Sequence, residues 1–164
     1  MRFEKDIVVI VETNVDDVTG EVLAFVIDRL LNEGAYDATA STYIGKKGRL
    51  GYTIRVVCSK RTAQKIAKIL VEETGTLGVK MTEYTRLIVP RKVRKFPVSI
   101  EGFRGKATVK VAKHARKILR IKPEISEAKK IAESHNIPLR EVIERIVTSA
   151  ENQLKGQTTR KPSR

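Results

Sequence analysis

The sequence of 164 residues contains a single cysteine and only two histidines. With one thiol no internal disulfide can form, and one thiol with two imidazoles cannot supply the ligands of a zinc finger. Cys58 ends an apolar, strand-like segment, where a small buried thiol is more common than a reactive one. We therefore expect neither a disulfide scaffold, nor a zinc finger, nor a cysteine nucleophile.

Long apolar runs are also missing. No run approaches the length that a transmembrane helix needs, which is about 20 residues. The first residues, MRFEKD, do not form the pattern of a signal peptide. Apolar residues nevertheless make up 41% of the chain, as in globular proteins, so we expect a cytoplasmic protein with a real hydrophobic core and no membrane partner.

Acidic residues are nearly absent from one part of the chain. Residues 86–122 contain thirteen lysines and arginines but only one acid, Glu101. Residues 152–164 add four bases and no acid, and the formal net charge of the chain is +14. Such a basic field attracts polyanions, which include nucleotides, nucleic acids and acidic proteins. One hypothesis is therefore a nucleic-acid-binding module that uses residues 86–122, although electrostatic attraction alone does not distinguish one nucleic-acid sequence from another.

The hydrophobic pattern predicts an α+β fold. Short β-branched runs alternate with amphipathic segments in the order β-α-β-β-α-β over residues 1–89. This order is typical of a ferredoxin-like domain, with two helices on one face of an antiparallel sheet. Residues 90–151 predict a β-hairpin followed by a pair of helices, and residues 113–122 fit neither pattern well. Residues 152–164 predict a disordered basic tail.

The most informative stretch, VETNVDDVTGE at residues 11–21, joins the first strand to the first helix. It brings carboxylates and an amide close together, at Glu12, Asn14, Asp16 and Asp17. Such oxygen ligands suit a hard divalent cation, often one that also holds phosphate groups. Asp16, Asp17 or Thr19 could instead cap the free N–H groups of the helix. A cap does not explain Glu12 and Asn14, so both interpretations stay open.

A cationic loop, GKKGRLG at residues 45–51, lies between the second and third strands. Its glycines expose backbone N–H groups, and Lys46, Lys47 and Arg49 add positive charge, so the loop could hold phosphate. It lacks the spacing and the strand-to-helix context of a Walker loop, and a solvated hairpin tip is the alternative. The turn at residues 74–78 is a second place where backbone could approach a ligand.

We expect the acidic loop and the cationic loop at opposite ends of the predicted sheet. This placement would separate the candidate metal ligands from the candidate phosphate ligands within one chain. The two loops could then meet only if the chain curls or if another subunit supplies one of them, and we expect a homo-oligomer that joins them across an interface.

Several segments, in the same order along the chain, resemble the C-terminal domain of the LarC family of nickel insertion proteins. They are ETNVDDVTGE at 12–21, KKGR at 46–49, ETGTLGV at 73–79, KPE at 122–124 and IPLREV at 137–142. The resemblance covers roughly residues 8–150, which is nearly all of the chain for which we predict order. Several matches in order are more specific than any one of them.

The resemblance implies a CTP-dependent nickel chelatase, classed as a lyase, that acts alone or as one subunit. In this family CTP and a divalent metal, Mg²⁺ or Mn²⁺, activate pyridinium-3,5-bisthiocarboxylate mononucleotide. Nickel, a substrate, then enters between two sulfurs and a ring carbon, and CMP and pyrophosphate leave.

The roles of single residues are our own inference and do not come from the motif match. We expect the metal to be bound by Glu12, Asn14, Asp16 and Asp17. The nucleotide would be bound by Lys46, Lys47, Arg49, Thr74, Thr76 and Arg86. Full-length family members carry an N-terminal domain and a metal-rich linker, which implies a separate chain equivalent to that domain as a partner.

Overall fold

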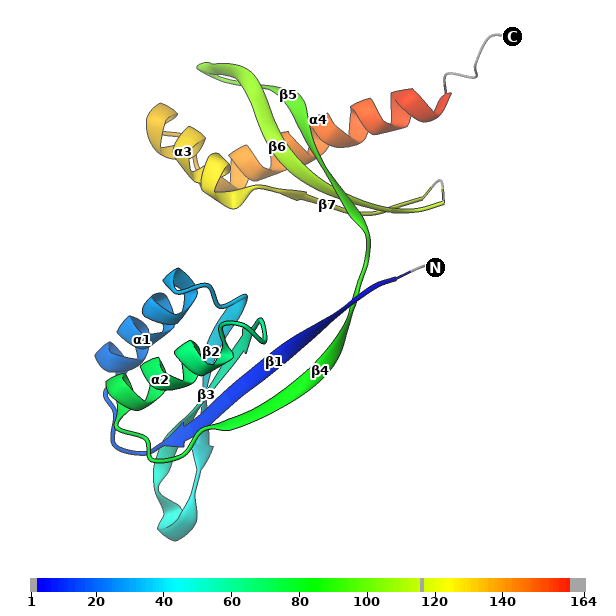
Figure 1. The fold of residues 1–164 in the computed structure, drawn as a ribbon. Helices are drawn as coiled ribbons and strands as arrows, with labels where there is room; N and C mark the ends of the chain where they lie inside the picture. The colour runs from blue at the N-terminus through cyan, green and yellow to red at the C-terminus, as the bar shows by residue number, and fades with distance from the viewer. Residues whose placement is uncertain (1–2, 116, 160–164) are drawn as a thin grey trace. The chain divides into compact units, whose positions relative to one another are not determined.

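The computed structural model of the protein describes residues 3–115 and 117–159. The chain divides into two compact units, one spanning Lys5–Ile88 and the other beginning at Val89. Within the described residues (Figure 1) the elements are β1 (Glu4–Val15), α1 (Gly20–Asn32), β2 (Asp37–Ile44), the 3₁₀ turn η1 (Lys46–Gly48), β3 (Leu50–Cys58), α2 (Ala63–Thr74), β4 (Lys80–Ile88), β5 (Arg91–Ile100), β6 (Phe103–His114), β7 (Lys117–Pro123), α3 (Ile125–His135) and α4 (Leu139–Thr159).

The predicted α+β class is confirmed. The described residues form a four-stranded sheet, a three-stranded sheet and four α-helices, and the strand pairs β1–β3, β2–β3, β5–β6 and β6–β7 are antiparallel. No helix in this part of the chain is long and apolar enough to cross a membrane.

The first unit is built on β1, the strand that the short β-branched run at residues 7–11 predicts. The strand order is β2-β3-β1-β4, and α1 and α2 lie on the same face of the sheet (Figure 1). Every second residue of β1 from Val9 to Val15 is buried, because a strand turns alternate side chains to opposite faces. These side chains share one core with the buried stripes of both helices, which centre on Leu30 and Ile66.

Replacement of Ile66 by alanine is expected to destabilise the first unit by about 2–5 kcal/mol, because a fully buried side chain would leave a cavity in a packed core. Urea unfolding measures this loss as a lower midpoint. Leu77→Ala is the matched control, since the Leu77 side chain is fully exposed and its removal should change stability by less than about 0.5 kcal/mol. Equal losses in both variants would contradict this description of the core.

The second unit pairs β5, β6 and β7 in that order, and its core lies between this sheet and the helices α3 and α4. Phe96 and Val98 of β5 meet Val142 and Ile146 of α4 in one cluster of buried side chains. The residues that alternate with the buried ones include five bases, Arg91, Lys95, Arg104, Lys106 and Lys110. The predicted hairpin and helix pair are therefore present.

The strand β7 falls in residues 113–122, which the sequence pattern does not assign. Its partly buried residues, Ile118 and Ile121, both pack against the core although they are three positions apart. A register shift opposite Ala112 and Lys113 makes this possible, because a β-bulge inserts one extra residue into a strand. The bulge removes the period of two by which a strand is recognised in a sequence.

The helix α4 continues to Thr159 and so enters the range 152–164 for which we expect no ordered structure. Leu154 is fully buried against the core of the second unit, which gives the extra turns of the helix an apolar contact. Residues 160–164 of the expected tail lie outside the described residues.

Candidate functional site

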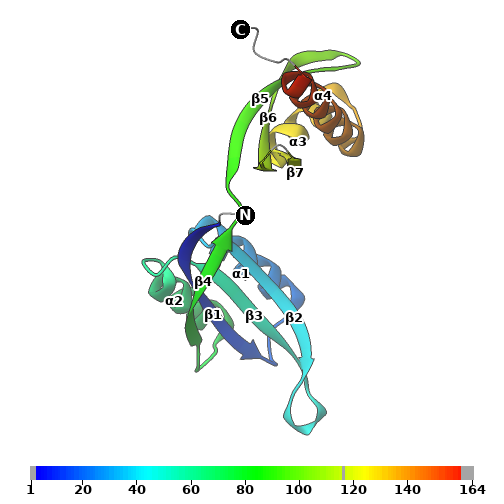
Figure 2. The ribbon, with the colours of Figure 1, turned by 90° about the vertical axis from the view of Figure 1, so that its right-hand side faces the viewer.

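Three connections of the first unit meet at one end of its sheet. In the antiparallel pair β1 and β3, Val15 lies opposite Tyr52, so the end of β1 is beside the start of β3. The β2–β3 hairpin, with Ile44 opposite Leu50, closes at this same end and extends past β1 (Figure 2). The turn after α2 also reaches this end, where the Thr13 hydroxyl donates to the Gly78 carbonyl over 2.8 Å.

The expectation that the acidic and cationic loops lie at opposite ends of the sheet is wrong. β1 and β2 both run antiparallel to β3, so the last residues of both strands lie at the same end of the sheet, beside the start of β3. The residues after β1 therefore lie beside the turn that follows β2. A single chain brings the two loops together. The expectation of a homo-oligomer rested on their separation within one chain, so it loses this support.

The two loops meet in a cavity of about 380 Å³, here called the hairpin pocket, which is lined by Asp16, Tyr43, Gly45, Lys46, Lys47 and Arg49. The Arg49 guanidinium approaches the Asp16 carboxylate, with 3.4 Å between Nη1 and Oδ2. Both side chains remain partly exposed, so this pair is weak and can open to a ligand at small cost.

The backbone of the cationic loop has an unusual conformation. Lys47 adopts φ 60° and ψ 24°, and Gly48 has φ 71°, which places both in or near the left-handed region. A non-glycine residue rarely adopts this region, and such residues cluster at ligand-binding loops. Turns of this kind can aim successive N–H groups at one point and form an anion-binding concavity. The N–H groups of Gly45 and Arg49 bond to carbonyls within the loop, so its three cationic side chains are the main candidates for holding phosphate.

Thr19 caps α1, since its side chain accepts a hydrogen bond from the backbone N–H of Val22 over 3.4 Å. Asp16 and Asp17 precede the cap, so capping does not explain them. Both are exposed, and Asp16 faces the hairpin pocket. The positive end of the α1 dipole nearby favours negative charge at this position.

Glu12 lies on the face of the sheet that the helices leave open, between two cations. Its carboxylate accepts hydrogen bonds from Arg55, over 2.9 and 3.0 Å, and from Lys80, over 3.1 Å. The hydrogen bonds from Lys80 and from Arg55 lower the pKa of Glu12 below its usual value, which favours the ionised carboxylate. The two cations offset its negative charge. Asn14 accepts from the Thr53 hydroxyl over 3.4 Å.

The four candidate metal residues do not form one cluster. Within the described residues no group of three or more histidine, cysteine, aspartate or glutamate side chains is arranged to hold a metal ion. Asp16 contacts the cationic loop, whereas Glu12 is engaged on the sheet.

Thr74 and Thr76 are buried and bond to protein groups. Thr74 donates to the Leu70 carbonyl over 2.6 Å, and the hydroxyls of Thr76 and Thr13 are 2.6 Å apart. Thr76 also donates to the Gly78 carbonyl over 3.1 Å. These bonds tie the turn after α2 to the end of β1, so both threonines fix the shape of this region.

Arg86 lies away from the hairpin pocket. It donates two hydrogen bonds to Asp6, of 3.0 and 2.5 Å, and its guanidinium lies 4.9 Å from the centre of the Tyr36 ring. Asp6 is near the start of β1, whereas the pocket is at the end of that strand. The structure therefore does not bring Arg86 to the other candidate nucleotide-binding residues.

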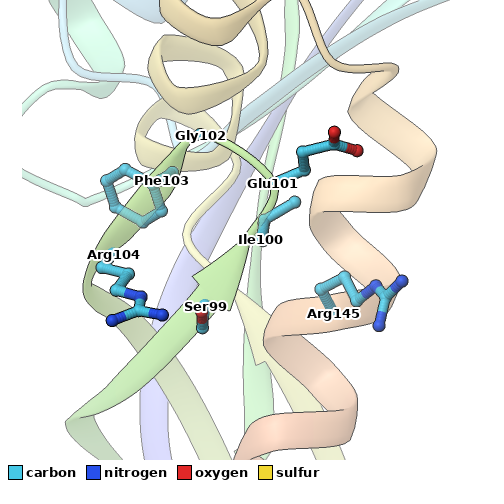
Figure 3. A pocket seen from close by; sticks show the side chains of 7 residues that line it. All are labelled: Ser99, Ile100, Glu101, Gly102, Phe103, Arg104 and Arg145. Atoms are coloured by element: carbon cyan, nitrogen blue, oxygen red, sulfur yellow. The ribbon is translucent and has the colours of Figure 1, made fainter.

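A second cavity, of about 560 Å³, lies at the β5–β6 turn of the second unit, and its lining includes Ser99, Glu101, Arg104 and Arg145. Arg104 and Arg145 lie on opposite sides of Ser99 and Ile100 in Figure 3. Arg145 also contacts Glu141 at 3.9 Å. These cations come from a strand and a helix and do not form a single loop, so the hairpin pocket is the stronger candidate for a polyphosphate.

The chain belongs to the nickel insertion protein family, whose model matches residues 1–143. Among its relatives, a putative nickel insertion protein of Methanothrix thermoacetophila is 40% identical over 143 residues, which is 87% of this chain and 36% of that protein. The pyridinium-3,5-bisthiocarboxylic acid mononucleotide nickel insertion protein of Thermotoga petrophila is 32% identical over 141 residues, which is 86% of this chain and 34% of that protein. The chain thus spans about a third of the length of these relatives.

A solved structure supports the same assignment. It is the apo form of LarC2, described as the C-terminal domain of a cyclometallase involved in the synthesis of the NPN cofactor of lactate racemase. The TM-score is 0.79 at 28% identity, over 90% of this chain and 99% of that one. The resemblance to the C-terminal domain of the LarC family is therefore confirmed. These comparisons give no support to the nucleic-acid-binding alternative for residues 86–122.

Proposed function

We propose that this chain takes part in a CTP-consuming insertion of nickel into a pyridinium-bisthiocarboxylate mononucleotide. The family, the name of the Thermotoga relative and the similarity to LarC2 support this function. The hairpin pocket is the observation that carries it, because the structure joins a cationic loop and an acidic loop that are far apart in sequence. A partner domain or chain is part of the proposal, since the chain spans only about a third of its relatives.

In the proposed site Lys46, Lys47 and Arg49 hold the triphosphate of CTP, and they offset the negative charge that develops as pyrophosphate leaves. Asp16 and Asp17 fit a Mg²⁺ or Mn²⁺ ion, because such an ion commonly needs only one or two carboxylates when phosphates and waters complete its ligands. When bound, the ion would supply charge neutralisation between the phosphates. Glu12 could join only if Arg55 and Lys80 turned away from it.

Two further assignments belong to the proposal. The β-α-β-β-α-β order of the first unit, its strand order and the placement of both helices on one face support a ferredoxin-like arrangement. Thr74 and Thr76 are proposed to shape the site through the turn that they hold, and Arg86 to act as a structural partner of Asp6.

Calorimetric titration with the four ribonucleoside triphosphates tests the proposal. CTP is expected to bind more tightly than ATP, GTP or UTP, and Mn²⁺ or Mg²⁺ should strengthen its binding by shielding the carboxylates from the phosphates. EDTA should remove the gain. Equal affinity for all four nucleotides, with no effect of EDTA, would contradict the proposed function.

A further inference from the structure

Tyr43 lines the hairpin pocket together with the three cations and Asp16. It is the residue before the last of β2, and its partner across the hairpin is Gly51 of β3. The sequence alone gives no reason to assign Tyr43 to a binding site, because the charged residues lie in the loop that follows it.

The Tyr43 ring lies directly on the backbone of two glycines. A Cβ atom added at Gly51 would come within 2.7 Å of the ring carbon Cζ and of the hydroxyl oxygen. A Cβ atom added at Gly45 would come within 2.9 Å of Cε2. Real side chains do not tolerate contacts this short, so a substitution at either glycine would displace the ring.

These two glycines are not needed for an unusual backbone conformation. Gly45 has φ −92°, which any residue can adopt, and Gly51 is not among the described glycines with positive φ. What distinguishes both positions is the space that the ring occupies. An aromatic side chain that covers a glycine across a hairpin is a recognised way to stabilise a strand pair, so packing accounts for one side of the ring.

Packing against the two glycines does not explain why the rest of the ring lines the hairpin pocket. Tyr43 is only partly buried, and its remaining surface lines a cavity beside Lys46, Lys47 and Arg49. A flat aromatic surface next to a group of cations is the combination that binds nucleotides, in which the ring stacks and the phosphates pair with the cations.

We propose that Tyr43 is the platform on which the aromatic ring of a ribonucleoside phosphate stacks while the cationic loop holds its phosphates. This inference rests on the proposed function for the presence of a nucleotide. Two rings share the required chemistry, the cytosine of CTP and the pyridinium of the mononucleotide substrate. Stacking accepts any flat ring, so Tyr43 contributes affinity and leaves the choice of base to other contacts.

The test compares ligands with and without a ring on the full chain. The probes are CTP with Mn²⁺, nicotinic acid mononucleotide as a pyridinium mononucleotide, and inorganic tripolyphosphate with Mn²⁺, each titrated by calorimetry. Tyr43→Leu is expected to weaken binding of a ring-bearing probe by roughly 5- to 150-fold, the range of one base–aromatic stack. Binding of tripolyphosphate should change by less than about twofold, because it makes no stacking contact.

Three further variants separate stacking from structure. Tyr43→Phe keeps the ring and should recover most of the affinity that Tyr43→Leu loses. Gly51→Ala should weaken the ring-bearing probes as Tyr43→Leu does, because it displaces the ring. Tyr84→Leu removes an exposed tyrosine of β4 outside the pocket and serves as the matched control.

Each outcome decides the proposal. If Tyr43→Leu weakens the binding of tripolyphosphate as much as the binding of CTP, Tyr43 only shapes the loop, and the proposed stacking role is wrong. Unchanged binding of both ring-bearing probes overturns it as well. A wild-type chain that binds tripolyphosphate but neither ring-bearing probe overturns both the platform and CTP binding. If only nicotinic acid mononucleotide binds and depends on Tyr43, the platform stands for the pyridinium ring and the proposed CTP site fails.

Discussion

Replacement of both Asp16 and Asp17 by asparagine is expected to abolish the metal-dependent part of CTP binding. Asparagine keeps an oxygen at each position but removes the negative charge that a hard divalent cation requires. A loss of about 100-fold or more is expected, since loss of an outer partner of a metal ligand alone costs about 10- to 100-fold. Calorimetry with and without Mn²⁺ measures the difference.

The same variant should leave metal-free CTP binding unchanged or slightly stronger. Asp16 is the acidic partner of Arg49, so its neutralisation frees the guanidinium for a phosphate group. The matched control is the double variant Asp28→Asn and Asp37→Asn, which removes two exposed carboxylates of the same unit outside the pocket. Full metal-dependent binding in the Asp16 and Asp17 variant would show that these residues do not hold the metal.

Removal of the three cations of the hairpin pocket should have an effect of similar size. With glutamine at Lys46, Lys47 and Arg49, the affinity for CTP is expected to fall by roughly 10- to 2,000-fold, because three hydrogen bonds are lost and a typical one contributes about 0.5–1.5 kcal/mol net. Tripolyphosphate should lose as much, since the lost contacts are made to phosphate. Titrations at two salt concentrations should show a weaker salt dependence in the variant.

A second set of three cations controls for net charge. The variant with glutamine at Arg61, Lys65 and Lys68 removes the same charge from the region of α2, where Lys65 and Lys68 form surface ion pairs with Glu33 and Glu72. Its affinity for CTP should stay within about threefold of the wild type, since distant exposed charges are screened. Equal losses in both variants would mean that the hairpin loop acts through the general field of the chain.

The local pattern of the sequence was enough to predict the elements of the first unit. The short β-branched run in β1 and the helical spacing of apolar residues in α1 both indicate burial, and burial decides these elements. The order of several short motifs along the chain predicted the family, because matches in order are more specific than any one of them. The family assignment is confirmed by the comparisons, while the roles of individual site residues stay predictions.

What the sequence did not reveal depends on strand register. The meeting of the two loops follows from Val15 lying opposite Tyr52, and the position of Arg86 follows from its pairing with Asp6. The contact of Tyr43 with Gly51 is also a contact between strands. The register is set by the packing of a whole face of a sheet, so it cannot be predicted from the residue type at any single position.

The bulged strand β7 and the proline of β5 have a consequence for how the chain avoids aggregation. These strands are the outer strands of the second sheet, and an unpaired strand edge can recruit strands of other molecules. Pro97 has no N–H to donate on β5, and the bulge of β7 is flanked by Lys117, Arg120 and Lys122. Proline, bulges and lysine-rich edges are devices that natural sheets use against edge-to-edge pairing. Part of the basic charge of residues 86–122 thus has a sufficient explanation in solubility, with no bound polyanion required.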